Sequence, residues 1–193
     1  IGGHANTLSS DCTGLIREDW HAPYFVDESG KEEVGRFCVR SKEFADYIDG
    51  EFEAYLTELE GICGVWIDDD FRMGNHRQSC WCDSCIAEFS KRQGREYTRQ
   101  ELVRLVNDDF DIRDAWIQFT SDRAHDAAKM FAETVHKYAP DAYMALQHGA
   151  NGYMQGCGHT SVFEAFMEGS GVAPRSRPGG GSYEDYDPNT FIR

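Results

Sequence analysis

Three cysteines stand close together in the run Cys80-Trp81-Cys82-Asp83-Ser84-Cys85, and this spacing is typical of a metal site. A C-x-C-x-x-C cluster places three thiolates around one point, and a fourth ligand completes the tetrahedron that Zn²⁺ prefers. By spacing alone His76, four residues before Cys80, could be that ligand. The chain has seven cysteines, an odd number that full disulfide pairing does not explain. The sequence therefore predicts a zinc site, with disulfides or free thiols as the alternative.

A second candidate site is the run Asp68-Asp69-Asp70, which directly follows the apolar segment 62–67. Crowded carboxylates raise the pKa of at least one of their number, and a carboxyl group shifted in this way donates a proton near neutral pH. In an extended chain Asp68 and Asp70 point to one side and Asp69 to the other. A solvated acidic loop and a Ca²⁺ or Mg²⁺ site are the alternative interpretations of this triplet.

Two more polar residues follow apolar segments of the chain. His148 comes directly after the segment 142–147, and Arg177 comes directly after the segment 172–176. Because the carboxyl ends of barrel strands form the active face, we expect both side chains to line the same pocket as the aspartates. A single histidine or arginine in a loop is more often solvated or structural, so the argument rests on their common position at strand ends.

The elements that must position these residues are helices alternating with short apolar strands. Residues 1–40 show no sustained periodicity and are expected to be loop and crossover. From residue 41 onward the capping residues and apolar periodicity predict helices and strands. Helices are expected over 42–60 after Ser41, over 83–93 with Asp83 as a cap, from Thr98, over 111–138, and from Ser161 to Gly169. Strands are expected at 62–67, with Cys63 in the core, at 142–147 and at 172–176.

This alternation predicts an α/β fold with a parallel sheet and helices outside it. An open doubly wound sheet and part of a (β/α)₈ TIM barrel both fit the order of elements. Three strands cannot close a barrel, which needs about 200–250 residues or more. The first residue is Ile, and residues 187–193 read as the start of a helix that stops. We therefore expect residues 1–193 to be a single domain that is a segment of a barrel domain, completed by the remainder of a longer chain or by self-association.

The composition excludes several classes of partner. The chain has 19 Lys and Arg against 34 Asp and Glu, a formal net charge of −15. A nucleic acid or an anionic membrane surface would be repelled by this charge. No apolar run is long enough to span a bilayer. Reduced cysteines favour a cytoplasmic location, although the N-terminus that would carry an export signal is missing.

Three stretches of the sequence, in this order and at similar separations, resemble the glycoside hydrolase family 42 β-galactosidases. The family carries R-x-Y-C-x-x-S, then W-x-I-D-N-E-Y at the end of a strand, then C-Y-C-x-x-C-x-x-x-F. The corresponding stretches here are Arg36-Phe37-Cys38-Val39-Arg40-Ser41, Trp66-Ile67-Asp68-Asp69-Asp70-Phe71, and Cys80-Trp81-Cys82 followed by Cys85 and Phe89. Residues 114–122 are similar to the family's D-W-x-x-F helix, and the match covers roughly residues 35–147.

The resemblance implies a TIM barrel in which the segments 62–67 and 142–147 are the fourth and fifth strands. It implies that Cys38, Cys80, Cys82 and Cys85 hold a structural Zn²⁺, with Cys38 in place of His76. Asp70 lies where the family has its acid/base glutamate and Asp69 where it has asparagine, so this chain departs from the family at both positions. The family's nucleophile lies on a later strand, beyond Arg193.

The function expected from these features is hydrolysis of an O-glycosidic bond in a carbohydrate substrate. Asp70 is expected to protonate the leaving oxygen. The substrate-binding candidates are Asp68, Asp69, Arg36, His148 and Arg177. The alternatives are a sugar-binding or structural segment of a degenerate barrel without catalysis, and a hydrolase that uses the carboxylates to hold a second metal ion.

Overall fold

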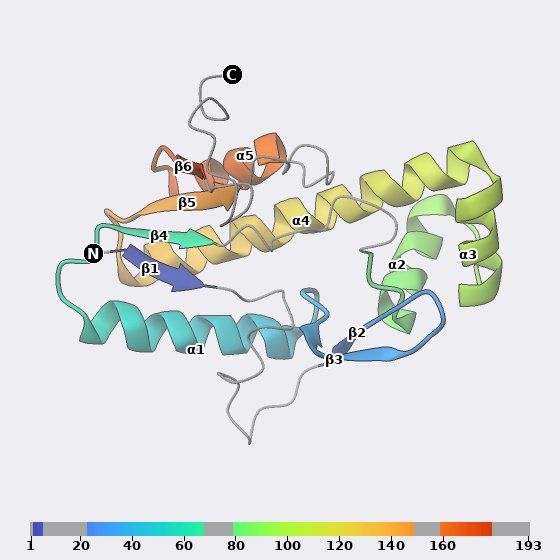
Figure 1. The fold of residues 1–193 in the computed structure, drawn as a ribbon, viewed down its shortest axis with the longest axis horizontal. Coiled ribbons are helices and arrows are strands. Elements are labelled where there is room, and N and C mark those ends of the chain that lie inside the picture. The colour runs from blue at the N-terminus through green and yellow to red at the C-terminus, as the bar shows by residue number, and fades with distance from the viewer. Residues whose placement is uncertain (1, 6–22, 68–78, 149–158, 179–193) are drawn as a thin grey trace, which may run out of the picture.

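Four parallel strands form the central sheet of the computed structural model, which describes residues 2–5, 23–67, 79–148 and 159–178 (Figure 1). In spatial order the strands are β1 (Gly2–Ala5), β4 (Gly64–Ile67), β5 (Tyr143–His148) and β6 (Arg175–Pro178). Each strand pairs in parallel with the next. The predicted parallel α/β sheet is confirmed. Its first strand was expected to be loop, because two glycines and a histidine carry no apolar pattern and only the pairing with β4 makes them a strand.

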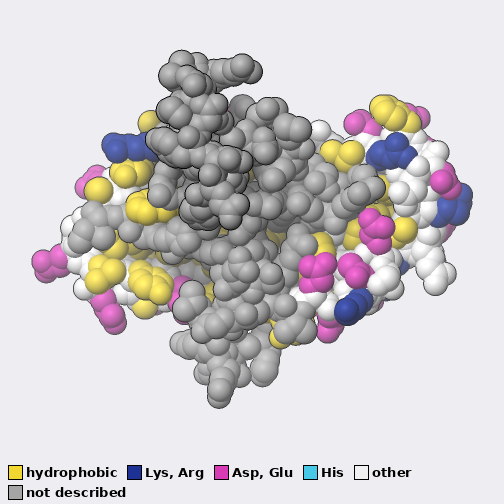
Figure 2. Space-filling view, viewed as in Figure 1, with side chains coloured by type: hydrophobic (Ala, Val, Ile, Leu, Met, Phe, Trp, Pro, Cys, Tyr) yellow, Lys and Arg dark blue, Asp and Glu magenta, His cyan; other side chains and the backbone are white. Residues whose placement is uncertain are grey.

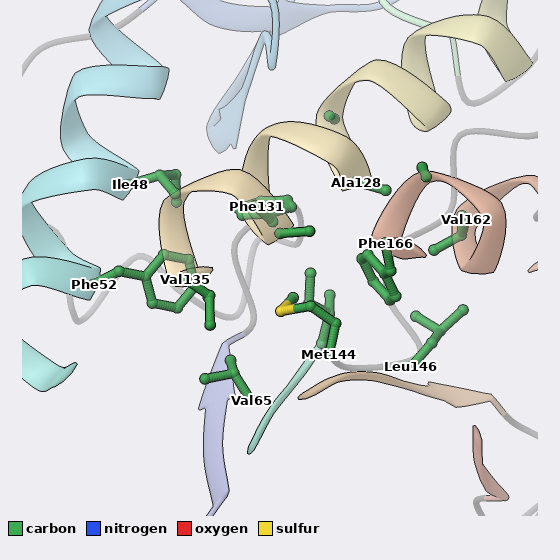
Figure 3. Packing of buried hydrophobic residues seen from close by; sticks show 14 of the residues in the cluster. Ile48, Phe52, Val65, Ala128, Phe131, Val135, Met144, Leu146, Val162 and Phe166 are labelled. Carbon is green, nitrogen blue, oxygen red and sulfur yellow. The ribbon is translucent and has the colours of Figure 1, made fainter. Parts of the chain in front are cut away.

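Three helices cover one face of this sheet. They are α1 (Lys42–Glu58), α4 (Phe110–Tyr138) and α5 (His159–Ser170). Their buried side chains form one apolar cluster with the side chains of Val65 and Ile67 from β4 and of Met144 and Leu146 from β5 (Figure 3). Strand order follows chain order throughout the described sheet, whereas a doubly wound sheet reverses its order at a switch point. The described strands do not close a barrel.

Helix α1 shows how the sequence pattern produces this packing. The side chain of Ser41 accepts a hydrogen bond from the backbone N–H of Phe44 at 3.0 Å and caps the helix as predicted. Phe44, Ile48 and Phe52 follow one another at intervals of four and are buried against the sheet. Leu59, expected to continue this stripe, is 50% exposed because the helix ends at residue 58 and the chain turns away.

A second region lies at the far end of α4 from the sheet (Figure 1). Helices α2 (Asp83–Gln93) and α3 (Arg99–Asp108) pack there against the first turns of α4. The capping box at Thr98 is confirmed, since its side chain accepts from the N–H of Glu101 at 3.2 Å. Asp83 is wrong as the cap of α2, because Cys82 occupies the N-cap position and makes no side-chain capping bond. At this end of the molecule Lys, Arg, Asp and Glu side chains are interspersed on the surface (Figure 2).

A hairpin that the sequence analysis did not predict stands beside the second region. It consists of β2 (Tyr24–Val26) and β3 (Glu32–Phe37), which pair antiparallel. The turn between them is held by the carboxylate of Asp27, which accepts from the N–H groups of Ser29 and Lys31. Gly30 has φ +89, a conformation that favours glycine. Strands of three and six residues with a polar turn carry too little periodicity to be recognised beforehand.

Several boundaries differ from those expected. Helix α5 begins at residue 159, so Ser161 lies inside it, where its Oγ is 3.0 Å from Nδ1 of His125 instead of capping the helix. Strand β6 covers 175–178 instead of 172–176, so Arg177 lies within the strand. His148 is the last residue of β5. Cys63 is exposed just before β4, not in the core. The predicted helix start at 187–193 lies outside the described residues.

Candidate metal centre

Four cysteine side chains from two parts of the chain meet at one point. Cys38 directly follows β3, Cys80 precedes α2, Cys82 is the N-cap of α2, and Cys85 lies in its first turn. Their sulfur atoms all lie within 4.8 Å of one another. All four are free thiols. Cys38, Cys80 and Cys85 are buried, and Cys82 is half-buried. The three closely spaced cysteines that the sequence singled out are therefore brought together with a fourth one, Cys38, from more than forty residues away.

Two of the distances between the sulfurs match those expected around a tetrahedral zinc ion. A Zn–S bond of about 2.3 Å places the sulfurs of a regular tetrahedron about 3.8 Å apart. The Sγ atoms of Cys38 and Cys85 are 3.6 Å apart, and those of Cys38 and Cys82 are 3.8 Å apart. Those of Cys82 and Cys85 are closer, at 3.0 Å. Four sulfur ligands without nitrogen or oxygen form a soft site, which suits zinc.

Backbone hydrogen bonds hold the cysteines in these positions. The N–H of Cys38 donates to the carbonyl of Pro23 at 2.9 Å, so the hairpin carries this residue. The N–H of Trp81, between two of the cysteines, donates to the carbonyl of Val26 at 2.8 Å. The hairpin therefore fixes both the distant cysteine and the cysteine run, which explains how residues so far apart in sequence reach one point.

The start of helix α2 favours negative charge on the sulfur atoms. Cys82 is the N-cap residue and Cys85 lies in the first turn, where the N–H groups and the helix dipole present partial positive charge. The carbonyl of Cys82 accepts from the N–H of Cys85 at 3.0 Å and from that of Ile86 at 3.1 Å, which closes the turn. Thiolates are the form that binds metals, and a helix N-terminus lowers the pKa of a thiol.

Contacts among the sulfurs shift their pKa values in opposite directions. The hydrogen bond with Cys80 lowers the pKa of Cys38 to about 7. The hydrogen bond with Cys38 lowers the pKa of Cys82. The hydrogen bonds with Cys38 raise the pKa of Cys80 and that of Cys85. Four crowded sulfurs thus resist becoming four anions together, and a cation among them removes this resistance.

The structure describes only some of the other residues that the sequence singled out. Asp68, Asp69, Asp70 and His76 lie outside the described residues. Arg36 belongs to β3, on the hairpin. In the sheet, Ile67 at the end of β4 pairs with Leu146, two residues before His148, and Gln147 pairs with Arg177. The backbone of the sheet therefore brings His148, Arg177 and the point from which the aspartate run departs to the same edge.

The sequence analysis missed one residue of the cysteine site, Arg123 on α4. Its side chain is 1% exposed, and its Nη2 atom lies 3.7 Å from the sulfur of Cys38. Its guanidinium lies over the ring of Phe119, with the central carbon 5.3 Å from the ring centroid. Burial acts to lower the pKa of Arg123, but the charges of Cys85 and Cys38 outweigh it and the pKa is raised. The sequence did contain an indication that Arg123 is buried. It stands four residues from both Phe119 and Ala127 and so interrupts the apolar stripe of a predicted helix.

Comparisons with known proteins give little further information. No protein-family model and no curated protein match the chain. One solved structure similar to it is the polyextremophilic β-galactosidase from the Antarctic haloarchaeon Halorubrum lacusprofundi, with 17% sequence identity and a TM-score of 0.46. The likeness covers 66% of this chain and 24% of that one, so the chain spans about a quarter of that enzyme's length. None of the helices in the described part of the chain has the length and hydropathy needed to span a bilayer.

Proposed function

We propose that the chain is part of a barrel-type glycoside hydrolase whose four cysteines hold a structural zinc ion. The observation that carries the metal assignment is the meeting of four sulfurs within 4.8 Å of one another, with three of the four cysteines buried. A site with four protein ligands has no open position for water or substrate. The ion would therefore stabilise the fold around α2 and the hairpin and take no part in the chemistry.

The glycosidase assignment rests on the order of the three resembling stretches and on the edge at which the strands end. Strand β4 leads directly into Asp68-Asp69-Asp70, and β5 and β6 carry His148 and Arg177 to the same edge. A carboxylic acid at that edge protonates the glycosidic oxygen, and a second carboxylate attacks the sugar or activates water. We assign the first role to Asp70. The resemblance puts the second carboxylate beyond Arg193.

The remaining candidates would bind the sugar. Asp69 replaces the family's asparagine and still offers oxygen acceptors to sugar hydroxyl groups, whereas Asp68, Arg36, His148 and Arg177 would complete the pocket. Asp70 is one methylene shorter than the glutamate it replaces, so the sugar has to lie closer to the backbone of this strand. We therefore expect a substrate preference that differs from that of the family 42 enzymes.

Metal analysis tests the zinc assignment directly. The purified protein should contain about one zinc ion per chain, and a Cys38→Ser, Cys85→Ser double variant should contain none. A matched control is Cys63→Ser, which changes an exposed cysteine outside the cluster and should keep the metal. Wild-type protein that is purified without metal and takes up no added zinc would overturn the assignment.

Activity on a panel of aryl glycosides tests the catalytic assignment. The Asp70→Asn variant should lose at least 100-fold in kcat, in the range typical of general acid catalysis. Asp46→Asn, an exposed carboxylate on α1, should leave the rate unchanged. Equal rates in the wild type and Asp70→Asn would remove the role of Asp70. Sugar binding without turnover would favour the non-catalytic alternative, and activity that needs added Mg²⁺ or Mn²⁺ would favour the metal-dependent hydrolase.

A further inference from the structure

Arg123 carries a buried positive charge to which the proposed function assigns no role. The residue lies in the middle of α4 and is almost completely buried, at 1% exposure. Its Nε and Nη1 atoms have no hydrogen-bond partner among the residues that the structure describes. Its third guanidinium nitrogen, Nη2, donates to a sulfur of the cysteine cluster. A buried arginine without an anion is costly, and the cysteine cluster is the group that its Nη2 contacts, at 3.7 Å from the sulfur of Cys38.

The charge of a zinc ion with four thiolates supplies what Arg123 lacks. Two positive charges on the ion and four negative charges on the sulfurs leave a net charge of −2 in a largely buried site. The guanidinium offsets half of that charge, and its Nη2 donates to the sulfur of Cys38 at 3.7 Å. Groups that donate to metal ligands in this way orient them and raise the affinity for the metal.

We infer that Arg123 is the counter-charge of the cysteine centre, a positioning residue that orients the side chain of Cys38 and ties α4 to the metal. This inference rests on the proposed zinc centre. Arginine suits the role better than lysine, because its charge is permanent and its flat guanidinium stacks on Phe119 while an N–H group points at the sulfur. The zinc–cysteine site, with its net negative charge, and the positive Arg123 thus stabilise each other, because burying either charge without the other costs free energy.

Zinc affinity is the first test. Competition with a chromophoric chelator should give a Kd for Zn²⁺ that is about 10–100-fold higher in Arg123→Met than in the wild type. Arg123→Lys keeps the charge and should recover part of the affinity. Co²⁺ bound in place of Zn²⁺ should show altered sulfur-to-metal charge-transfer bands in Arg123→Met, a signature that loss of packing alone would not produce.

Stability without metal is the second test, and the expected sign is opposite to that of an ordinary core substitution. In excess chelator Arg123→Met should be at least as stable as the wild type, because it removes a buried charge that the zinc centre no longer balances. With zinc bound it should be less stable. The control Phe131→Leu, in the sheet core, should lower stability under both conditions and leave zinc affinity unchanged.

The outcomes separate the two proposals. A wild-type protein that binds no zinc overturns the zinc centre. A wild-type protein that binds zinc, together with an Arg123→Met variant of the same affinity and Co²⁺ spectrum, overturns the role of Arg123 and leaves the zinc centre intact. Weaker binding in Arg123→Met with partial recovery in Arg123→Lys supports the inference.

Discussion

The two halves of α4 are buried in cores of different kinds. Its second half packs on the sheet through alanines and Phe131, in a cluster that extends over α1, α5, β4 and β5 and includes Phe37 of β3. Its first half packs through Trp116 and Phe119 on α2 and α3, in a smaller, mainly aromatic cluster next to the cysteines. Arg123 stands between them. A large apolar core stabilises itself by burial, whereas a small one commonly needs a metal or a disulfide. With the proposed zinc in place, we therefore expect the region around α2, and not the sheet side, to depend on the ion.

Metal removal should produce the largest effect, and it should destabilise the region around α2 while leaving the sheet side folded. Structural zinc contributes about 10–16 kcal/mol in small zinc-binding peptides. We expect chelation to abolish hydrogen-exchange protection in α2 and α3 while α1 and α5 keep theirs. Loss of protection throughout the described chain, or none anywhere, would contradict the division into two regions.

Removal of a central ring from the sheet core is the converse experiment. Phe131 is 0% exposed and its ring lies edge-on to Phe44 and Phe52, with centroids 6.3 and 6.2 Å away. Phe131→Ala should lower the free energy of unfolding by about 3–5 kcal/mol, because it leaves a cavity in the larger core. Zinc affinity, measured in the folded protein, should not change. A weakened metal site in this variant would show that the two cores are coupled.

A pair of helix glycines tests how closely α4 and α5 approach on the sheet side. A Cβ atom at Gly169 of α5 would stand 2.6 Å from the carbonyl oxygen of Lys129 and 2.8 Å from Cβ of Ala132. Gly169→Ala should therefore cost about 1–3 kcal/mol. Gly50→Ala in α1 has open space and should stabilise the protein by up to about 1 kcal/mol. Thermal unfolding of both variants measures the difference, and a stabilised Gly169→Ala would refute the close approach.

The smallest expected effect is a loss of folding stability at low pH that comes from one ion pair on the sheet side. The hydrogen bond from Lys137 on α4 to Asp49 on α1, at 2.9–3.0 Å, lowers the pKa of that carboxyl. A lowered pKa stabilises the fold above the unfolded value of about 3.9, and this contribution is lost as the pH falls through the lowered value. Because the pair is partly exposed, it contributes at most about 1 kcal/mol. Urea unfolding at pH 6 and pH 3 should show a smaller loss in Asp49→Asn; an identical loss would rule the pair out.

The fold of the helices was largely predictable from local pattern. Ser41 and Thr98 cap helices where expected, and the stripe from Phe44 to Leu56 is buried as its spacing predicts. These features depend on neighbours in sequence, which local propensity and periodicity report. Strand β1 and the hairpin were not predictable in this way, since they owe their structure to pairing partners far away or to a tight turn.

The candidate sites divide along the same line. The spacing of the cysteine run predicted a metal site, and the alternation of helices with apolar strands predicted the parallel sheet. Only the tertiary structure brought Cys38 to the other three sulfurs and buried Arg123 beside them, because both depend on the hairpin and on the packing of α4. Ligands that are close in sequence can be recognised from their spacing. The pairing of a buried charge with a distant cluster cannot, because it depends on which buried groups the fold places side by side.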